Sequence, residues 1–151
     1  MSGQSLWAAN ALWAGRAIAD RLADQVPALR EVLVMDEIGP NGPGPKQFPA
    51  ALVLLHAMRP VGPLTEGATR VALEQDWLVA VAVKSVRPEA DRNNAAAGPV
   101  IPKVISALLG WAPGAESRQN RALVWRPGPD VNYGRDITYY PFIFTLQAVT
   151  A

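Results

Sequence analysis

The sequence predicts an α+β fold, in which an antiparallel or mixed β-sheet of about five strands packs against two helices. Three observations support this fold class. Residues 137–151 alternate apolar and other side chains with a period of two, as in a strand with one face on a core. Residues 99–109 carry apolar side chains at helical spacing. Prolines and glycines gather between such periodic stretches, which is typical of long loops.

A first helix is predicted over residues 6–25, with Ser5 as its cap and Pro27 beyond its end. Its large apolar side chains lie on two separate faces, so two interpretations remain open. Either the helix contacts its own core on one face and a neighbouring subunit on the other, or the sheet and a loop cover one broad face. The two faces hold Leu6 with Trp13 and Ile18 with Leu22.

Three strands are predicted next. The first covers residues 29–37, and the second covers residues 50–58, which are apolar on both faces and therefore central in the sheet. The third lies within residues 68–86, where Trp77 and the valines after it point one way and mostly small residues point the other. We expect the large side chains in the core, while the small ones permit close approach of a helix or another subunit. Loops rich in proline and glycine connect these strands at residues 38–49 and 59–67.

The second half of the chain is predicted to begin with a polar, alanine-rich loop over residues 87–98. The helix over residues 99–109 follows, with prolines in its first turn and Gly110 at its end. Its apolar stripe contains Ile101, Val104, Ile105, Leu108 and Leu109.

Two further strands complete the predicted sheet, over residues 122–126 and 137–151, with a turn rich in glycine and proline between them. Pro141 removes one ladder hydrogen bond from the second of them. We therefore expect that strand at an edge of the sheet, or with a bulge.

Composition bounds the classes of protein that the chain can represent. It has 151 residues, of which 50% are hydrophobic and 18% charged, as in one globular domain over residues 1–151 and unlike a disordered chain. Lys and Arg number 14 against 13 Asp and Glu, a net charge of +1, and the basic residues are scattered. Strong affinity for nucleic acid through phosphate contacts is therefore not expected.

The absence of cysteine and the hydropathy of the chain exclude further kinds of site and protein. The chain has no cysteine, which excludes disulfides, thiolate catalysis and zinc–thiolate sites. The first residues lack the basic and apolar regions of a standard export signal. No stretch approaches the ~18 consecutive apolar residues of a membrane span. We expect a soluble protein that is assembled in a cytoplasm.

No cluster of residues in the sequence indicates a reaction. His56 is the only histidine and lies in a predicted central strand without a second ligand, which favours a structural role over that of a general base. Asp36 and Glu37 are adjacent in a strand and so point to opposite faces. Ser106 has no nucleophile-elbow sequence around it. The glycine-rich segment at residues 39–44 lacks the Gly-Lys-Ser/Thr of a phosphate-binding loop.

The remaining acidic cluster, formed by Glu66, Glu74 and Asp76, is more typical of a solvated strand face than of a metal site. We therefore expect a protein that is not an enzyme, with no catalytic residue, cofactor or metal. The five tryptophans favour a self-associating structural protein instead, because aromatic residues are enriched at interfaces. We expect at least two of them in the core. They are Trp7, Trp13, Trp77, Trp111 and Trp125.

Four features occur in a distinctive order along nearly the whole chain. An amino-terminal helix leads through residues 22–27 into the strand at residues 29–35, and a long strand surrounds Trp77. A helix then follows a variable loop, and residues 130–146 close the sheet. In the order of these elements and the character of their residues, the chain resembles the tail terminator (tail-completion, minor tail) proteins of long-tailed bacteriophages.

The resemblance implies a structural virion protein that forms a ring, usually a hexamer, on the head-proximal end of the tail tube. There it would end tube growth and offer the surface for head–tail joining. The implied partners are other copies of the chain, the tail tube protein and the head–tail connector or neck protein. Phage DNA would pass through the lumen without specific binding, and no membrane is involved. The family has no catalytic residues to carry over.

Candidate contact residues follow only from expected exposure in the loops and beside them. They are Trp7, Trp13, Asn41, Lys46, Arg59, Arg87, Arg92 and Trp111. Two alternatives remain open. The chain could be a different head–tail connector or neck protein, which would also form rings. It could also be a monomeric ligand-binding module, which would need a pocket that the sequence does not indicate.

Overall fold

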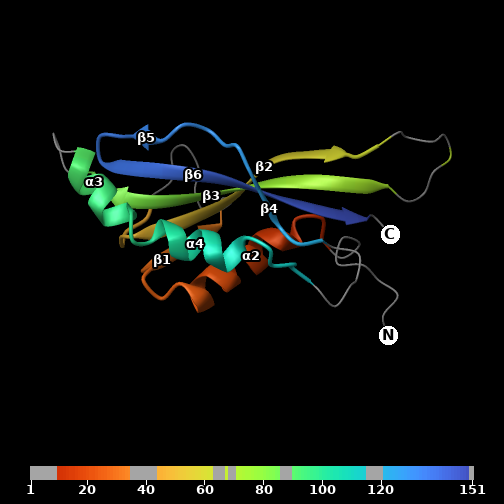
Figure 1. Ribbon diagram of the computed structural model, residues 1–151, viewed down its shortest axis with the longest axis horizontal. Helices are drawn as coiled ribbons and strands as arrows, with labels where there is room; N and C mark the ends of the chain where they lie inside the picture. Colours follow the sequence, from red (N-terminus) through yellow and green to blue (C-terminus); the bar gives the residue numbers. More distant parts are fainter. Residues whose placement is uncertain are drawn as a thin grey trace.

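The fold is seen in a computed structural model of the chain (Figure 1), which describes residues 10–34, 44–62, 67, 71–85, 90–114 and 121–149. Helices and a mixed sheet make it α+β, as predicted. The described elements, in chain order, are α2 (Trp13–Gln25), β1 (Glu31–Val34), β2 (Ala50–Pro60), β3 (Ala72–Lys84), α3 (Ala90–Ala97), α4 (Ile101–Leu108), β4 (Val124–Arg126), β5 (Asn132–Tyr133) and β6 (Ile137–Val149).

The strands form one sheet in the order β1-β2-β3-β6-β4, and β5 also pairs with β6. β1 runs parallel to β2, and the other pairings are antiparallel. β3 and β6 are paired without a register shift from Ala72↔Val149 to Lys84↔Ile137, so they form the centre of the sheet.

α2 and α4 pack on one face of this sheet, and Figure 1 places α3 near the end of β3. Trp77 and the alternate valines of β3 lie in the core beneath these helices, as predicted from their alternation. Gly15 allows α2 to approach closely, since a Cβ atom there would lie 2.8 Å from Cζ3 of Trp77. From α2 and α4, the core receives Ile18, Leu22, Val104 and Leu108.

The small residues of β3 were expected to permit close approach of a helix or another subunit, and segments of the same chain lie there instead. Ala80 and Ala82 are buried within the single chain. Segments of the same chain approach this face: a Cβ at Gly44 would lie 3.2 Å from Ile137 Cδ1, and one at Gly128 would lie 3.1 Å from Ile143 Cγ1. This part of the face is therefore not available to a second subunit.

Both predicted helices are present, with changes at their ends. α2 ends before Pro27, as expected, and Asn10 Oδ1 accepts a hydrogen bond of 3.0 Å from the Leu12 amide before the helix begins. Ser5 and Leu6 lie outside the described residues. α4 ends at Leu108, and Gly110 follows shortly after it with a φ of +78° that suits glycine. Leu109 has left the helical stripe and is exposed, because its backbone is already extended.

The prediction of a loop over residues 87–98 was wrong, because α3 occupies Ala90–Ala97. Its alanines have the highest helix propensity, which outweighs the polar composition of the segment. β5, within the predicted turn at residues 127–136, was also not predicted.

Pro141 was expected in an edge strand or at a bulge, but β6 is an interior strand and its pairing with β3 has no register shift. β5 pairs with Thr138 and Tyr139, and β4 pairs with residues 143–145, so Pro141 falls in the gap between these two partners. At Pro141, β6 is paired only with β3, so this position resembles one in an edge strand.

His56 is exposed and is not the interior histidine that was expected. β2 is buried at residues 50–53, but its outer half extends past the helices (Figure 1). The register shifts between Leu55 and Ala57, so His56 is at a β-bulge.

Candidate interaction surfaces

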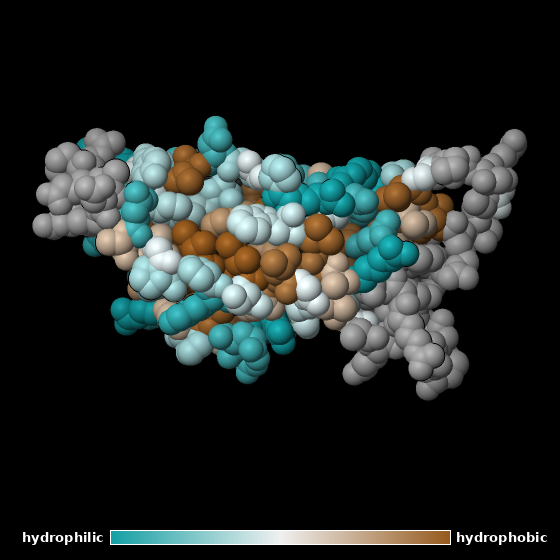
Figure 2. Space-filling model, in the orientation of Figure 1, coloured by the Kyte–Doolittle hydropathy of each residue, from teal (hydrophilic) through white to brown (hydrophobic). Residues whose placement is uncertain are grey.

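An exposed apolar surface lies at the β4 edge of the sheet. We call it the β4 patch and define it as Leu109 and Trp125, which are 50% and 47% exposed, whereas Val124, 49% exposed, alternates with Trp125 and points to the other face of the sheet. The Trp125 ring packs edge-on against Phe142, with ring centroids 6.0 Å apart. Figure 2 shows a hydrophobic area across the middle of the molecule, at the level of α4. Large exposed apolar side chains that gather in this way are typical of contact sites.

Local hydrogen bonds fix this edge. The Gly110 amide donates to the Leu123 carbonyl at 3.2 Å, and the Leu123 amide donates to the Trp111 carbonyl at 2.8 Å. They hold the segment after α4 against the residue before β4. Arg121, before β4, and Arg126, the last residue of β4, are both exposed.

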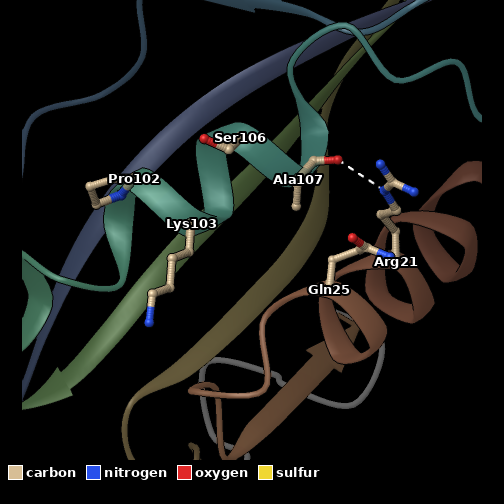
Figure 3. Close-up of a pocket in the computed structure, with 6 residues that line it drawn as sticks. All are labelled: Arg21, Gln25, Pro102, Lys103, Ser106 and Ala107. Atoms are coloured by element: carbon tan, nitrogen blue, oxygen red, sulfur yellow. Dashed lines mark hydrogen bonds between the residues drawn. The ribbon is translucent and has the colours of Figure 1, made fainter.

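A pocket of about 340 Å³ lies between α2 and α4 (Figure 3). Arg21 Nε donates to the Ala107 carbonyl at 3.0 Å, and the guanidinium carbon lies 5.1 Å from the centre of the Trp111 ring. Figure 3 shows the Lys103 side chain pointing away from Arg21, so the two cations do not converge on one ligand. The arrangement fixes Trp111 at the end of α4 and offers no catalytic geometry.

A second hollow, of about 510 Å³, lies beside the start of α2. Its walls are mainly apolar and come from α2, β1, β2 and β3. They include Leu12, Val34, Leu54, Leu55 and Trp77, together with Asn10 and Arg16.

The outer part of the β2–β3 pair carries a charged network. Arg59 forms ion pairs with Glu74 and Asp76, the latter at 2.8 Å, and Thr145 Oγ1 donates to Asp76 Oδ1 at 2.6 Å. Partial burial acts to raise the pKa of Asp76, but the hydrogen bonds from Arg59 and Thr145 outweigh it and hold the pKa below its ordinary value.

The acidic cluster expected from the sequence is therefore a strand-face ion-pair network as far as the structure describes it, and Glu66 lies outside the described residues. Within the described part of the chain, no group of three or more His, Cys, Asp or Glu side chains is placed to hold a metal ion.

Polar side chains attach α3 to the sheet. Asn93 Nδ2 donates to Thr138 Oγ1 at 3.2 Å, and the Ser85 hydroxyl lies 2.8 Å from the same oxygen. Tyr140 Oη donates to Asn94 Oδ1 at 2.6 Å. This network fixes α3, which contains Arg92, one of the expected contact residues.

The contact residues expected from the sequence do not form one surface. Trp13 is half-buried against the core, and Trp111 is half-buried under Arg21. Lys46 is exposed, and its amide donates to Glu31 Oε1 at 2.7 Å. Arg59 is exposed but ion-paired. Trp7, Asn41 and Arg87 lie outside the described residues, and only the backbone of Arg92 is described, in α3.

Among the described tryptophans, Trp77 is buried, whereas Trp13 and Trp111 pack partly against the core. Sequence reasoning missed the β4 patch. A signal was present, because Trp125 stands next to Arg126 in a short predicted strand, but its exposure depends on β4 lying at the sheet edge.

Comparison with known proteins identifies a matching protein family. The family model described as phage tail terminator protein matches residues 8–151 of the chain. No curated protein gives a significant match. Within the described residues, no helix has the length and apolar character needed to cross a membrane.

Proposed function

Because the chain belongs to the phage tail terminator protein family, we propose that it forms a ring at the head-proximal end of the tail tube. In this position, a hexameric ring ends growth of the tube and offers the surface that joins the tail to the head. The family gives the protein a structural role in the phage tail, and therefore a place in the virion. This role agrees with the expectation that the protein is not an enzyme.

The observation that carries the proposal is the β4 patch. A chain with two large apolar side chains about half exposed beside one sheet edge is suited to bury them against another protein. Closed rings of identical subunits repeat such a contact, so each single contact can be weak.

The partners follow from the proposed position. They are further copies of the chain, the tail tube protein and the head–tail connector or neck protein, while DNA passes through the lumen without specific recognition. Trp13, Lys46, Arg59 and Trp111 remain proposed contacts, as does Arg92. The alternative of a neck protein on the connector side would use rings of the same kind.

A monomeric ligand-binding module is less well supported. The pocket between α2 and α4 lacks convergent polar groups, because Arg21 is engaged with Ala107 and Trp111 and Lys103 points elsewhere (Figure 3).

The proposal is tested by growing tail tubes from purified tube protein with and without this chain, and by measuring tube lengths in negative-stain images. We expect rings on one tube end and no further elongation of capped tubes. Light scattering on the isolated chain gives the size of free rings. A chain that leaves tube length unchanged and binds the connector instead is a neck protein, and one that binds neither contradicts the proposal.

A further inference from the structure

We propose that Gln75 positions the amino-terminal end of α2 for assembly, by holding it against the sheet with a buried side-chain amide. This inference rests on the proposed function, because Trp13, the first residue of α2, is one of its proposed contacts. Gln75 is thereby a positioning residue, which acts on the contact surface through the helix that it holds.

The start of α2 has no side-chain cap of its own. Leu12 occupies the N-cap position, and its apolar side chain accepts no hydrogen bond from the first turn. The Leu12 amide donates to Asn10 Oδ1 at 3.0 Å, and the Trp13 amide donates to the Asn10 carbonyl at 3.2 Å. These two bonds join residues of the same turn and do not attach it to the sheet.

Gln75 provides the attachment from β3. Its side chain is 2% exposed, and Nε2 donates to the Ala11 carbonyl at 2.7 Å, while Oε1 accepts from Trp77 Nε1 at 3.1 Å. An indole N–H can only donate and a backbone carbonyl can only accept, so a planar amide fits between them in one orientation. An apolar side chain at this position would make neither bond.

The position of Gln75 is itself fixed by its two neighbours in the strand. Glu74 and Asp76 point to the opposite face, where both form ion pairs with Arg59 of β2, and Thr145 of β6 donates to Asp76. The strands on both sides of β3 therefore hold this point of its backbone. A buried amide on such a support restricts the motion of the turn that it binds.

The two partners of Gln75 also connect the elements that wall the hollow beside α2. Asn10 and Leu12, on either side of Ala11, line the hollow from the start of the helix, and Trp77 lines it from the sheet. The amide of Gln75 thus sets the separation between these two elements.

This arrangement has a consequence for assembly. Leu12 is 46% exposed and Trp13 is half-buried, so both can be reached by a neighbouring molecule. Because Gln75 fixes the turn that carries them, less conformational entropy is lost when they bind, and association is more favourable.

Gln75→Met provides the first test, because methionine is unbranched like glutamine but lacks the amide. The Trp13 and Gly15 amides, which close the first turn of α2, should exchange their hydrogens about tenfold faster than in the unmodified chain, as expected for the loss of one hydrogen bond. Hydrogen–deuterium exchange followed by NMR gives the rate at each amide.

Val79→Ala is the matched control. It removes buried atoms from the same face of β3, four residues from Gln75, and lowers the overall stability while it leaves the amide in place. The Trp13 and Gly15 amides should keep their original rates in this variant. Unchanged rates in Gln75→Met, or equal acceleration in both variants, would overturn the proposal.

Gln75→Asn keeps the test decisive if Gln75→Met does not fold. Asparagine retains the amide, but its side chain is one methylene shorter and cannot reach both Ala11 and Trp77. The same two amides should again exchange about tenfold faster, for the same reason. Original rates in Gln75→Asn would overturn the proposal.

Capping of tail tubes by the same variants connects the inference to assembly and keeps the two proposals separable. Half-maximal capping should require about tenfold more Gln75→Met than Val79→Ala. Equal capping by these two variants would overturn the role of Gln75 in assembly and leave the proposed function intact. Failure of the unmodified chain to cap tubes would instead refute the proposed function, and the exchange rates would still test whether Gln75 holds α2.

Discussion

The two faces of β3 are stabilised in different ways. From Trp77 to Val83, alternate side chains are buried beneath α2 and α4, and this face is stabilised by apolar contact. On the other face, the partly buried Glu74 and Asp76 form ion pairs with Arg59. Because a partly exposed ion pair contributes little, most of the folding free energy comes from the apolar face.

The largest effect should come from Trp77→Ala on the apolar face. The side chain is 2% exposed and packs against Gly15, so its loss leaves a cavity that the core cannot close. We expect a loss of about 3–5 kcal/mol in the free energy of unfolding, measured by chemical denaturation. An unchanged unfolding midpoint would contradict the placement of Trp77 in the core.

A smaller loss should follow from Gly15→Ala. The added Cβ would lie 2.8 Å from the Trp77 ring, which is buried and cannot swing away. Overpacking should cost about 1–3 kcal/mol, against a gain of about 1 kcal/mol in helix propensity. The net loss should be reduced when Trp77→Phe is introduced with it. Equal losses in the presence and absence of Trp77→Phe would show that the contact between the added Cβ and the Trp77 ring does not cause the loss of stability.

Changes on the ion-paired face of β3 should reduce stability less, and their effect should depend on pH. Asp76→Asn should reduce stability by about 1 kcal/mol near neutral pH, because hydrogen bonds to a carboxylate are lost. Since the folded state lowers the pKa of Asp76, its contribution is present above the ordinary value of 3.8 and is lost as the pH falls through the lower, folded-state pKa. Unfolding curves of both proteins should therefore converge in acid, and a gap that widens there would count against the network.

The smallest effect on folding should come from Trp125→Ser in the β4 patch. Its edge-on contact with Phe142 is worth about 0.5–1.5 kcal/mol. Ring formation should nevertheless fall sharply. Val131→Ser, at another exposed apolar position, provides the matched control and should assemble normally. Normal rings from Trp125→Ser would remove the patch from the subunit contact.

The parts of the fold that could be predicted are those in which one face of a strand or helix is buried, because the spacing of apolar residues then follows the period of the element. The alternation around Trp77 and the apolar spacing of α4 record the direction of the core, and both predictions were confirmed. α3 was missed because its helix propensity comes from small alanines between polar residues. The position of Pro141 was predicted wrongly because it depends on long-range pairing. Two short strands, β4 and β5, pair with the same side of β6, and no local pattern in the sequence indicates this.

The candidate site was less accessible to sequence reasoning, for a physical reason. Whether Trp125 and Leu109 are covered depends on which strand is last in the sheet, and this is a property of long-range pairing. The residues selected for their position in loops, such as Lys46 and Arg59, are exposed, but each takes part in a hydrogen bond within the chain.

The central pairing of β3 with β6 also has a consequence for the time course of folding. It joins residues 72–84 to residues 137–149, which are far apart in the chain. A pair of such high contact order forms slowly, because a large loop must close before any of its contacts is gained. During synthesis, α2, β1 and β2 leave the ribosome well before β6 does. Until β6 arrives, the core lacks Tyr140, Phe144 and Leu146, and this is the interval in which the nascent chain is most prone to aggregate.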